Sequence, residues 1–212
     1  MNGHTSALFF VTAFVVIRLT GRLATFRGPR SEGRGAVVEQ HVDLRERVSV
    51  GLFFLGALIL PLMSFGPWLS ALSYTLPDWM SWLGAAIMAS AGLLHWRAHA
   101  DLGRNYSMTV LLRERQSLVT DGVYAWIRHP IYASLWLIVI AQPLLVQHWI
   151  YGLSGLPTFA LLFFHRLRRE EGMMIHSFGD QYRDYMRRVG GVIPKASAWE
   201  TRSRRSERRG QR

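Results

Sequence analysis

The sequence predicts an all-α integral membrane protein with about five transmembrane helices. Half of its 212 residues are hydrophobic, and they are concentrated in runs that approach the roughly 20 residues needed to cross a bilayer. The 25 Lys and Arg residues lie at the ends of these runs, between them and in the C-terminal tail. Cysteine is absent, which excludes a disulfide framework, a thiol nucleophile and a thiolate metal site.

Five apolar segments account for the expected crossings. They are residues 5–19, 48–65, 79–96, 131–146 and 149–164. The third is rich in Ala and Gly, which lets neighbouring membrane helices approach closely. The last two are joined by Gln147 and His148 alone, so we expect an antiparallel helix hairpin there, with His148 in a structural role.

The distribution of positive charge predicts the orientation of these helices. All Lys and Arg residues fall in three segments, 18–47, 97–128 and 166–212, whereas the opposite loops at 66–78 and 147–148 have none. By the positive-inside rule, the N-terminus lies outside and the C-terminus is cytoplasmic. The net charge of +11 is therefore expected to meet anionic lipid headgroups, and we expect neither nucleic acid nor a metal as partner.

Two polar blocks adjoin the last two crossings. LVTDGVYAWIRHPIY covers residues 118–132, and RLRREEGMMIHSFG covers 166–179. Because a helix hairpin returns the chain to the side it left, we expect these blocks to face each other at one membrane surface. Arg166 and Glu170 share a helix face at a spacing of four, whereas Glu171 points about 100° away. An ordinary ion pair at the membrane edge would give the same spacing.

Several smaller features lead to further expectations. A β-branched run near 109–112 favours a short hairpin or an irregular lid. Gly179 and Asp180 are expected to interrupt the last helix, and the apolar face beyond them is typical of a helix lying on the membrane surface. His95 and His99 have the spacing of a metal pair, but no acidic partner lies between them, so we expect no metal site. One domain should cover residues 1–195, followed by a disordered basic tail at 196–212.

Together the two blocks resemble the isoprenylcysteine carboxyl methyltransferase family, over about residues 105–194. That family belongs to a broader group that includes membrane phospholipid N-methyltransferases. The resemblance implies S-adenosyl-L-methionine as cofactor, bound in a pocket at the cytoplasmic face. It also implies that Glu170 closes this pocket and that Arg166 binds the substrate, both with catalytic roles. The cofactor positions it implies, besides Glu170, are Gln116, Ser117, Leu118, Val119, Tyr124, His129, Pro130, Ile131 and Tyr132, where Gln116 replaces a histidine often found in the family.

The expected acceptor is a carboxylate on a lipid-like or prenylated molecule. A carboxylate is already ionised, so it needs no general base, and Arg166 could bind it through two hydrogen bonds. A phospholipid amine is the alternative, and for it Glu171 or His129 would have to act as base. Two other classes stay open: a membrane sterol-type reductase that uses NADPH, and a non-enzymatic membrane interaction protein. The membrane would be the inner membrane of a bacterium or the endoplasmic reticulum of a eukaryote.

Overall fold

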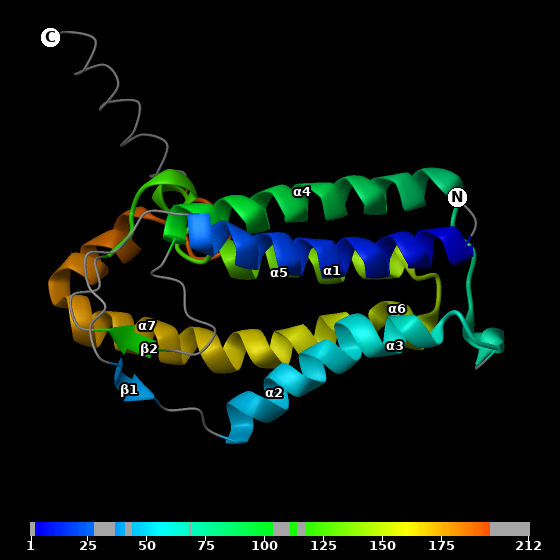
Figure 1. The fold of residues 1–212 in the computed structure, drawn as a ribbon, viewed down its shortest axis with the longest axis horizontal. Coiled ribbons are helices and arrows are strands. Elements are labelled where there is room, and N and C mark those ends of the chain that lie inside the picture. The colour runs from blue at the N-terminus through cyan, green and yellow to red at the C-terminus, as the bar shows by residue number, and fades with distance from the viewer. Residues whose placement is uncertain are drawn as a thin grey trace, which may run out of the picture.

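Long helices that run between two ends make up most of the chain in this computed structural model (Figure 1). The structure describes residues 3–27, 37–40, 44–67, 69–103, 111–113 and 118–195. The tail at 196–212 and the predicted cofactor residues Gln116 and Ser117 lie outside these ranges.

Each of the five predicted apolar segments lies mainly within helices. The first falls in α1 (Gly3–Arg27), and the second in α2 (Leu44–Phe54), the π-helical turn η1 (Leu55–Ile59) and α3 (Leu60–Met63). The third falls in α4 (Asp78–Leu102) and the fourth in α5 (Pro130–Leu145). The hairpin partner of α5 is formed by α6 (Trp149–Leu153) and α7 (Gly155–Arg188). Short 3-10 turns, η2 (Ser70–Leu72) and η4 (Gly122–Ala125), lie in the loops.

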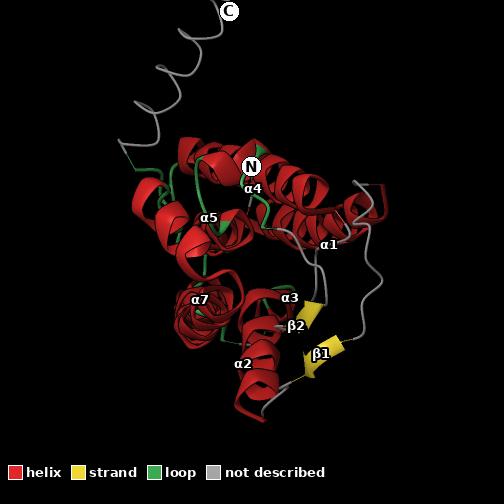
Figure 2. Cartoon of the chain, turned by 90° about the vertical axis from the view of Figure 1, so that its left-hand side faces the viewer, coloured by secondary structure: helices red, strands yellow, loops and turns green. Residues whose placement is uncertain are grey.

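The helices form two layers (Figure 2). One layer contains α1, α4 and α5, with α4 packed on both of the others, and the second contains α2, α3, α6 and α7, with α2 packed on α7. Aromatic rings join the layers, for example Phe14 against Phe53 and Trp136 against Phe159. Small residues allow the close approach predicted for the third segment, since a Cβ on Gly84 would lie 2.9 Å from the Leu144 Cβ.

Large apolar side chains also cover the outside of the helices, as expected where lipid replaces water. By length and composition, Gly3–Ala24 and Leu44–Met63 could each cross a membrane, and Pro130–Leu145 is a shorter apolar helix. Exposed apolar side chains occur on each long helix, among them Val16, Leu55, Trp82, Leu93, Ile140 and Phe164. The chain therefore has the character of a membrane protein.

The end of the predicted β-branched run lies in a strand whose partner is distant in the sequence. Strand β2 (Leu111–Arg113) pairs antiparallel with β1 (Val37–Gln40), in the register Val37↔Arg113 and Gln40↔Leu111. Residues 104–110 and 114–117 lie outside the described ranges, so the hairpin or irregular lid expected there stays a prediction. The fold is mostly helical, with this one pair of strands among the described residues.

A buried polar cluster joins α1, α4 and α5. The His95 Nδ1 lies 2.8 Å from the Ser134 Oγ, which itself donates to the Ile131 carbonyl, so the histidine is the donor of this pair. His95 Nε2 lies 3.5 Å from Nη1 of Arg18, and His99 Nδ1 donates to the His95 carbonyl at 2.8 Å. The pair with metal-like spacing is thus engaged within the bundle, and no group of three or more possible metal ligands occurs in the described ranges.

The loop end near the N-terminus is organised by neutral side chains. His148 Nδ1 accepts from the backbone N–H groups of Ile150 and Tyr151, both at 3.2 Å, and so caps α6. Its Nε2 donates to the Leu69 carbonyl at 3.0 Å. The Tyr74 hydroxyl donates to the Pro143 carbonyl at 2.6 Å. The structural role expected for His148 is therefore confirmed.

Candidate active site

The first polar block is fixed to the end of α4 by a carboxylate. Asp101 Oδ2 accepts from the Val123 backbone N–H at 2.8 Å, and Asp101 also pairs with Arg97 at 3.1 Å. Gly122 has a φ of 62°, and a Cβ added there would lie 2.0 Å from the Asp101 Oδ2. This turn therefore requires glycine, both for its left-handed backbone and for the close approach.

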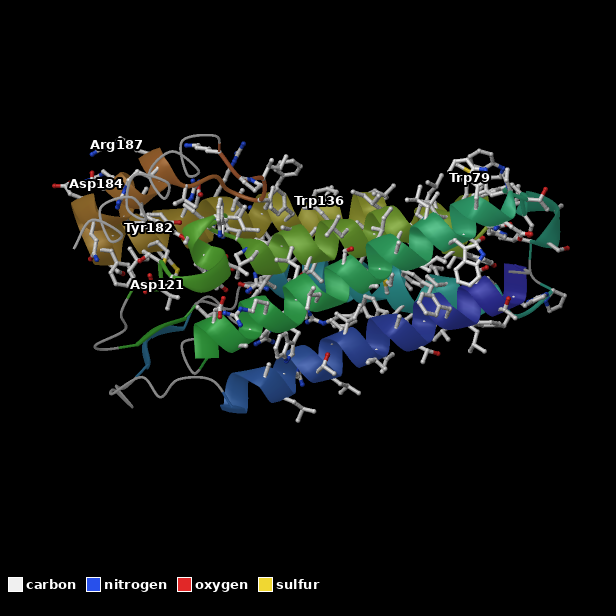
Figure 3. All side chains as sticks on the ribbon, turned by 90° about the horizontal axis from the view of Figure 1, so that it is seen from above. Trp79, Asp121, Trp136, Tyr182, Asp184 and Arg187 are labelled. Carbon is white, nitrogen blue, oxygen red and sulfur yellow. The ribbon has the colours of Figure 1, made fainter. Side chains whose placement is uncertain are left out.

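The second block lies on α7, which changes direction at Gly179. The φ of this residue is 52° and its ψ is −127°, so the predicted interruption of the helix is confirmed. Beyond it, the chain turns back towards the first block: Arg128 N donates to the Gly190 carbonyl at 2.8 Å, and His129 N donates to that of Gly191 at 3.0 Å. Figure 3 places Tyr182 and Asp121 at the same end of the molecule, opposite Trp79.

The apolar face of this last helical segment packs on the protein, which corrects the expected membrane-surface helix. Tyr182 and Tyr185 are buried against a cluster that includes Leu118 and Met174. The Tyr185 hydroxyl donates to the Tyr124 carbonyl at 2.6 Å. Burial, followed by the nearby Glu171 carboxylate, raises the pKa of Tyr182 to about 12. The segment thus covers the first block.

The two blocks meet at Glu170. Its Oε1 accepts a hydrogen bond from the Tyr132 hydroxyl and lies 3.5 Å from Nη2 of Arg166, one turn earlier on α7. His129 Nδ1 lies 4.0 Å from the other carboxylate oxygen. The predicted proximity of the blocks is confirmed, and Glu170, Arg166, His129 and Tyr132 form its centre.

Glu171 has different contacts from Glu170, although His129 lies close to both carboxylates. Arg128 Nη2 lies 2.7 Å and His129 Nε2 lies 3.2 Å from the same Glu171 oxygen. The hydrogen bond from His129, with further help from Arg128, outweighs the effect of burial and lowers the pKa of Glu171 to about 2. At neutral pH this carboxylate is therefore ionised and accepts hydrogen bonds from both Arg128 and His129, which makes it a poor proton acceptor.

A third carboxylate, Glu46, reaches the site from α2. One Glu46 oxygen lies 3.7 Å from the Arg166 Nε, and the other lies 3.3 Å from the Arg169 Nη1. Glu46 is only 3% exposed. Sequence reasoning missed it, because residues 41–47 resemble a simple interfacial lead-in to the second crossing. The available signal was an acidic residue between two arginines, just before the apolar run that begins at Val48.

Aromatic rings of α5 and α7 adjoin this charged cluster, which consists of Glu46, Arg128, His129, Arg166, Arg169, Glu170 and Glu171. The His129 and Tyr132 rings stack with centroids 5.8 Å apart, and Phe163 meets Tyr132 edge-on at 5.7 Å. Trp136 in turn packs against Phe163 at 5.6 Å. Aromatic faces beside carboxylates suit a ligand that carries positive charge.

Among the other predicted cofactor residues, the structure describes Leu118, Val119, Tyr124, Pro130 and Ile131. Pro130 occupies the first turn of α5, followed by Ile131, and Val119 lies in the loop before η4. Leu118 packs on the Tyr182 cluster. The Tyr124 hydroxyl donates to the Ala98 carbonyl at 3.4 Å.

Comparison with known proteins points to one family. The model of the isoprenylcysteine carboxyl methyltransferase family matches residues 82–176. The human protein-S-isoprenylcysteine O-methyltransferase is 32% identical over 118 residues, which cover 55% of this chain and 42% of the human protein. The Tribolium castaneum protein of the same name is 32% identical over 124 residues, with the same two coverages. The chain thus spans less than half the length of these curated relatives.

A solved structure has a similar fold. It is described as the eukaryotic intramembrane Ras methyltransferase, an isoprenylcysteine carboxyl methyltransferase, without a monobody. The match has a TM-score of 0.50 and 28% sequence identity, and it covers 76% of this chain and 55% of that protein. The family resemblance predicted from the two blocks is confirmed, and the matched region begins within α4, earlier than expected.

Proposed function

We propose, from its relationship to the isoprenylcysteine carboxyl methyltransferase family, that this chain is a membrane methyltransferase dependent on S-adenosyl-L-methionine. Its acceptor in this proposal is a carboxylate on a lipid-like or prenylated molecule. The observation that carries the proposal is the meeting of the two blocks at Glu170, where Tyr132 and Arg166 contact the same oxygen. An ordinary ion pair at a membrane edge would not need neighbouring aromatic rings or two further carboxylates.

The proposed topology has five crossings, with the N-terminus outside and the charged cluster at the cytoplasmic surface. The N-terminus lies at one end of the bundle, and the start of α5 and the last part of α7 lie at the other end (Figure 1). Trp79 and Trp149 are exposed and belong to the loop end near the N-terminus, as expected for residues at a membrane interface. Among the described residues, arginines occur near the end of α1, near the end of α4 and in the part of α7 that bears the cluster, which agrees with the positive-inside rule.

The residues of the cluster fit the proposed cofactor. S-adenosyl-L-methionine supplies an electrophilic methyl group on a positively charged sulfur. Glu170 offers a carboxylate, and His129 and Tyr132 offer aromatic faces directly beside it. We assign cofactor binding to these three residues together with Gln116, Ser117, Leu118, Val119, Tyr124, Pro130 and Ile131.

The same contacts favour a carboxylate acceptor over an amine. Arg166 is positioned one turn from Glu170 and would bind an acceptor carboxylate, which is ionised and needs no base. An amine acceptor must lose a proton, and Glu171 is poorly suited to take it, because Arg128 and His129 keep its pKa at about 2. What the protein supplies is position and exclusion of water, which can account for much of a methyl transfer's acceleration.

Calorimetric titration of the detergent-solubilised protein with S-adenosylhomocysteine tests this proposal. Saturable binding that Glu170→Gln weakens by about tenfold or more is the expected result, since a charge-assisted contact is lost. Asp184→Asn is the matched control: it removes an exposed carboxylate from the same helix, paired only to its neighbour Arg187 in the described contacts, and should leave the affinity unchanged.

The rival classes give different titrations. NADPH binding without S-adenosylhomocysteine binding would assign the chain to the reductases. Binding of neither ligand to folded protein would favour an interaction protein. A phospholipid N-methyltransferase would bind S-adenosylhomocysteine but transfer methyl groups to phosphatidylethanolamine and not to a prenylated carboxylate.

A further inference from the structure

Glu46 is a buried carboxylate that lies outside the residues matched by the family model. It belongs to the first turn of α2, whereas the family match covers residues 82–176. We infer that Glu46 is a positioning residue, which sets the orientation of the Arg166 guanidinium towards the acceptor. This inference rests on the proposed function, and it assigns a role to a part of the chain for which the family comparison gives none.

The contacts of Arg166 support this assignment. Glu46 approaches the guanidinium on its Nε edge at 3.7 Å, while Glu170 approaches Nη2 at 3.5 Å. Carboxylates on two different edges fix both the direction and the rotation of a planar guanidinium, which a single contact leaves open. One of these carboxylates comes from α2 and the other from α7 itself, so the orientation of Arg166 depends on the packing of α2 against α7.

Burial makes the contact strong. Glu46 is 3% exposed, and the Arg166 side chain is 14% exposed, so solvent screens their attraction only weakly. A carboxylate in such a place must be paired with positive charge. Arg169 supplies the second pairing at 3.3 Å. The Glu46 carboxylate is thus held between two arginines, and one of them, Arg166, also contacts Glu170.

The balance of charge explains why a third carboxylate belongs in this cluster. Three arginines, Arg128, Arg166 and Arg169, face the three carboxylates Glu46, Glu170 and Glu171. Without Glu46, Arg166 and Arg169 would each lose an ion pair, and the pair with Glu170 would draw the Arg166 guanidinium towards that residue. With Glu46 present, the Arg166 guanidinium is held between Glu46 and Glu170.

The test measures recognition of the acceptor carboxylate, separately from cofactor binding. The probes are S-farnesyl-N-acetylcysteine and its methyl ester, titrated into the protein saturated with S-adenosylhomocysteine. The ratio of the two dissociation constants, ester over acid, reports how well Arg166 meets the carboxylate. Glu46→Gln is expected to lower this ratio about tenfold while the affinity for S-adenosylhomocysteine stays within about twofold, because positioning is lost but the cofactor contacts remain.

Two further variants separate positioning from general effects. Arg168→Gln changes the charge of the same helical turn at an exposed position and should leave the ratio unchanged. Glu46→Asp keeps the charge but withdraws it by one methylene, so it should lower the ratio by less than Glu46→Gln. If Glu46→Gln does not fold, Glu46→Asp decides the matter, and an unchanged ratio in that variant would overturn the inference.

The outcomes distinguish this inference from the proposed function. Wild-type protein that fails to bind S-adenosylhomocysteine would refute the methyltransferase proposal itself. Wild-type protein that binds it and prefers the acid, together with a Glu46→Gln variant that keeps this preference, would refute the role of Glu46 alone. A third outcome is that the wild-type protein binds S-adenosylhomocysteine but binds the acid no more tightly than the ester. That result would refute the role given to Arg166, and with it the role of Glu46.

Discussion

The two ends of the helical bundle are organised by different interactions. At the end near the N-terminus, neutral side chains bond to backbone groups: His148 to the amides of α6, and Tyr74 to the Pro143 carbonyl. At the other end, charged side chains bond to one another across elements, as Glu46 does to Arg169 and Glu171 to Arg128. Figure 3 shows this separation, with Trp79 at the neutral end and Tyr182, Asp184 and Arg187 at the charged end.

This difference separates what the fold needs from what a site needs. Backbone groups left open at helix ends can be satisfied by neutral side chains at modest cost, and that is sufficient to close a loop. Bringing several partly buried charges together is costly unless every charge is paired. The charged end therefore has a demanding arrangement that the stability of a helical bundle alone does not require.

We expect the largest loss of stability from a substitution of Arg128, at the charged end. Arg128→Gln removes the pair with Glu171 and the hydrogen bonds to the Val189 and Met186 carbonyls, and it leaves a partly buried carboxylate with His129 alone. The unfolding free energy should fall by about 3–5 kcal/mol. Denaturant unfolding in detergent micelles measures this change.

Arg97→Gln is the matched control for that variant. Arg97 lies at the same end and pairs with Asp101, but its side chain is 53% exposed. Its loss should therefore cost no more than about 1 kcal/mol. Equal losses of unfolding free energy for Arg128→Gln and Arg97→Gln would mean that burial does not strengthen the ion pairs at this end of the bundle.

A pH dependence of stability should follow from Glu171. Its pKa is lowered from 4.5 to about 2 in the folded protein, so the unfolded chain binds the proton more readily. The stabilisation is therefore present above about pH 4.5 and is lost as the pH falls from there towards 2; in full it amounts to about 3 kcal/mol. The midpoint of thermal unfolding, followed between pH 6 and 3, should drop more steeply for wild-type protein than for Glu171→Gln. Parallel curves would show that Glu171 is not held in its ionised form.

A smaller effect than at Arg128 is expected at the end near the N-terminus. His148→Ala removes the cap of α6 and the bond to the Leu69 carbonyl, which should cost about 1–2 kcal/mol. The affinity for S-adenosylhomocysteine should not change, because the residue lies at the opposite end from Glu170. Thermal unfolding and calorimetry on the same preparation measure both quantities, and a large loss of affinity would contradict the separation of the two ends.

Local patterns in the sequence were sufficient for most helices and for the centre of the site. The apolar run at 131–146 correctly predicted α5, and the spacing of Arg166 and Glu170 correctly predicted that they share a helix face. Each of these signals depends on residues within a few positions of one another, where helix geometry determines what can meet. The crossings, their orientation and the cofactor residues remain predictions.

Partners distant in the sequence could not be predicted in this way. Nothing near Glu46 indicates that its partners are Arg166 and Arg169, and nothing in β2 indicates that it pairs with β1. The helix beyond Gly179 was assigned to the membrane surface because an apolar stripe has the same pattern whether lipid or protein covers it. Only the packing of Tyr182 and Tyr185 distinguishes the two.

The pairing of Glu46 with α7 has a consequence for how the protein is made. Glu46 and Arg169 are separated by 123 residues, so at about 5–20 residues per second the carboxylate is synthesised on the order of 6–25 seconds before its partner. Until then Glu46 has to stay in contact with water, since an unpaired charge is not stable in a dry interior. We therefore expect the second apolar segment to settle against α7 only after the last apolar segment has been translated.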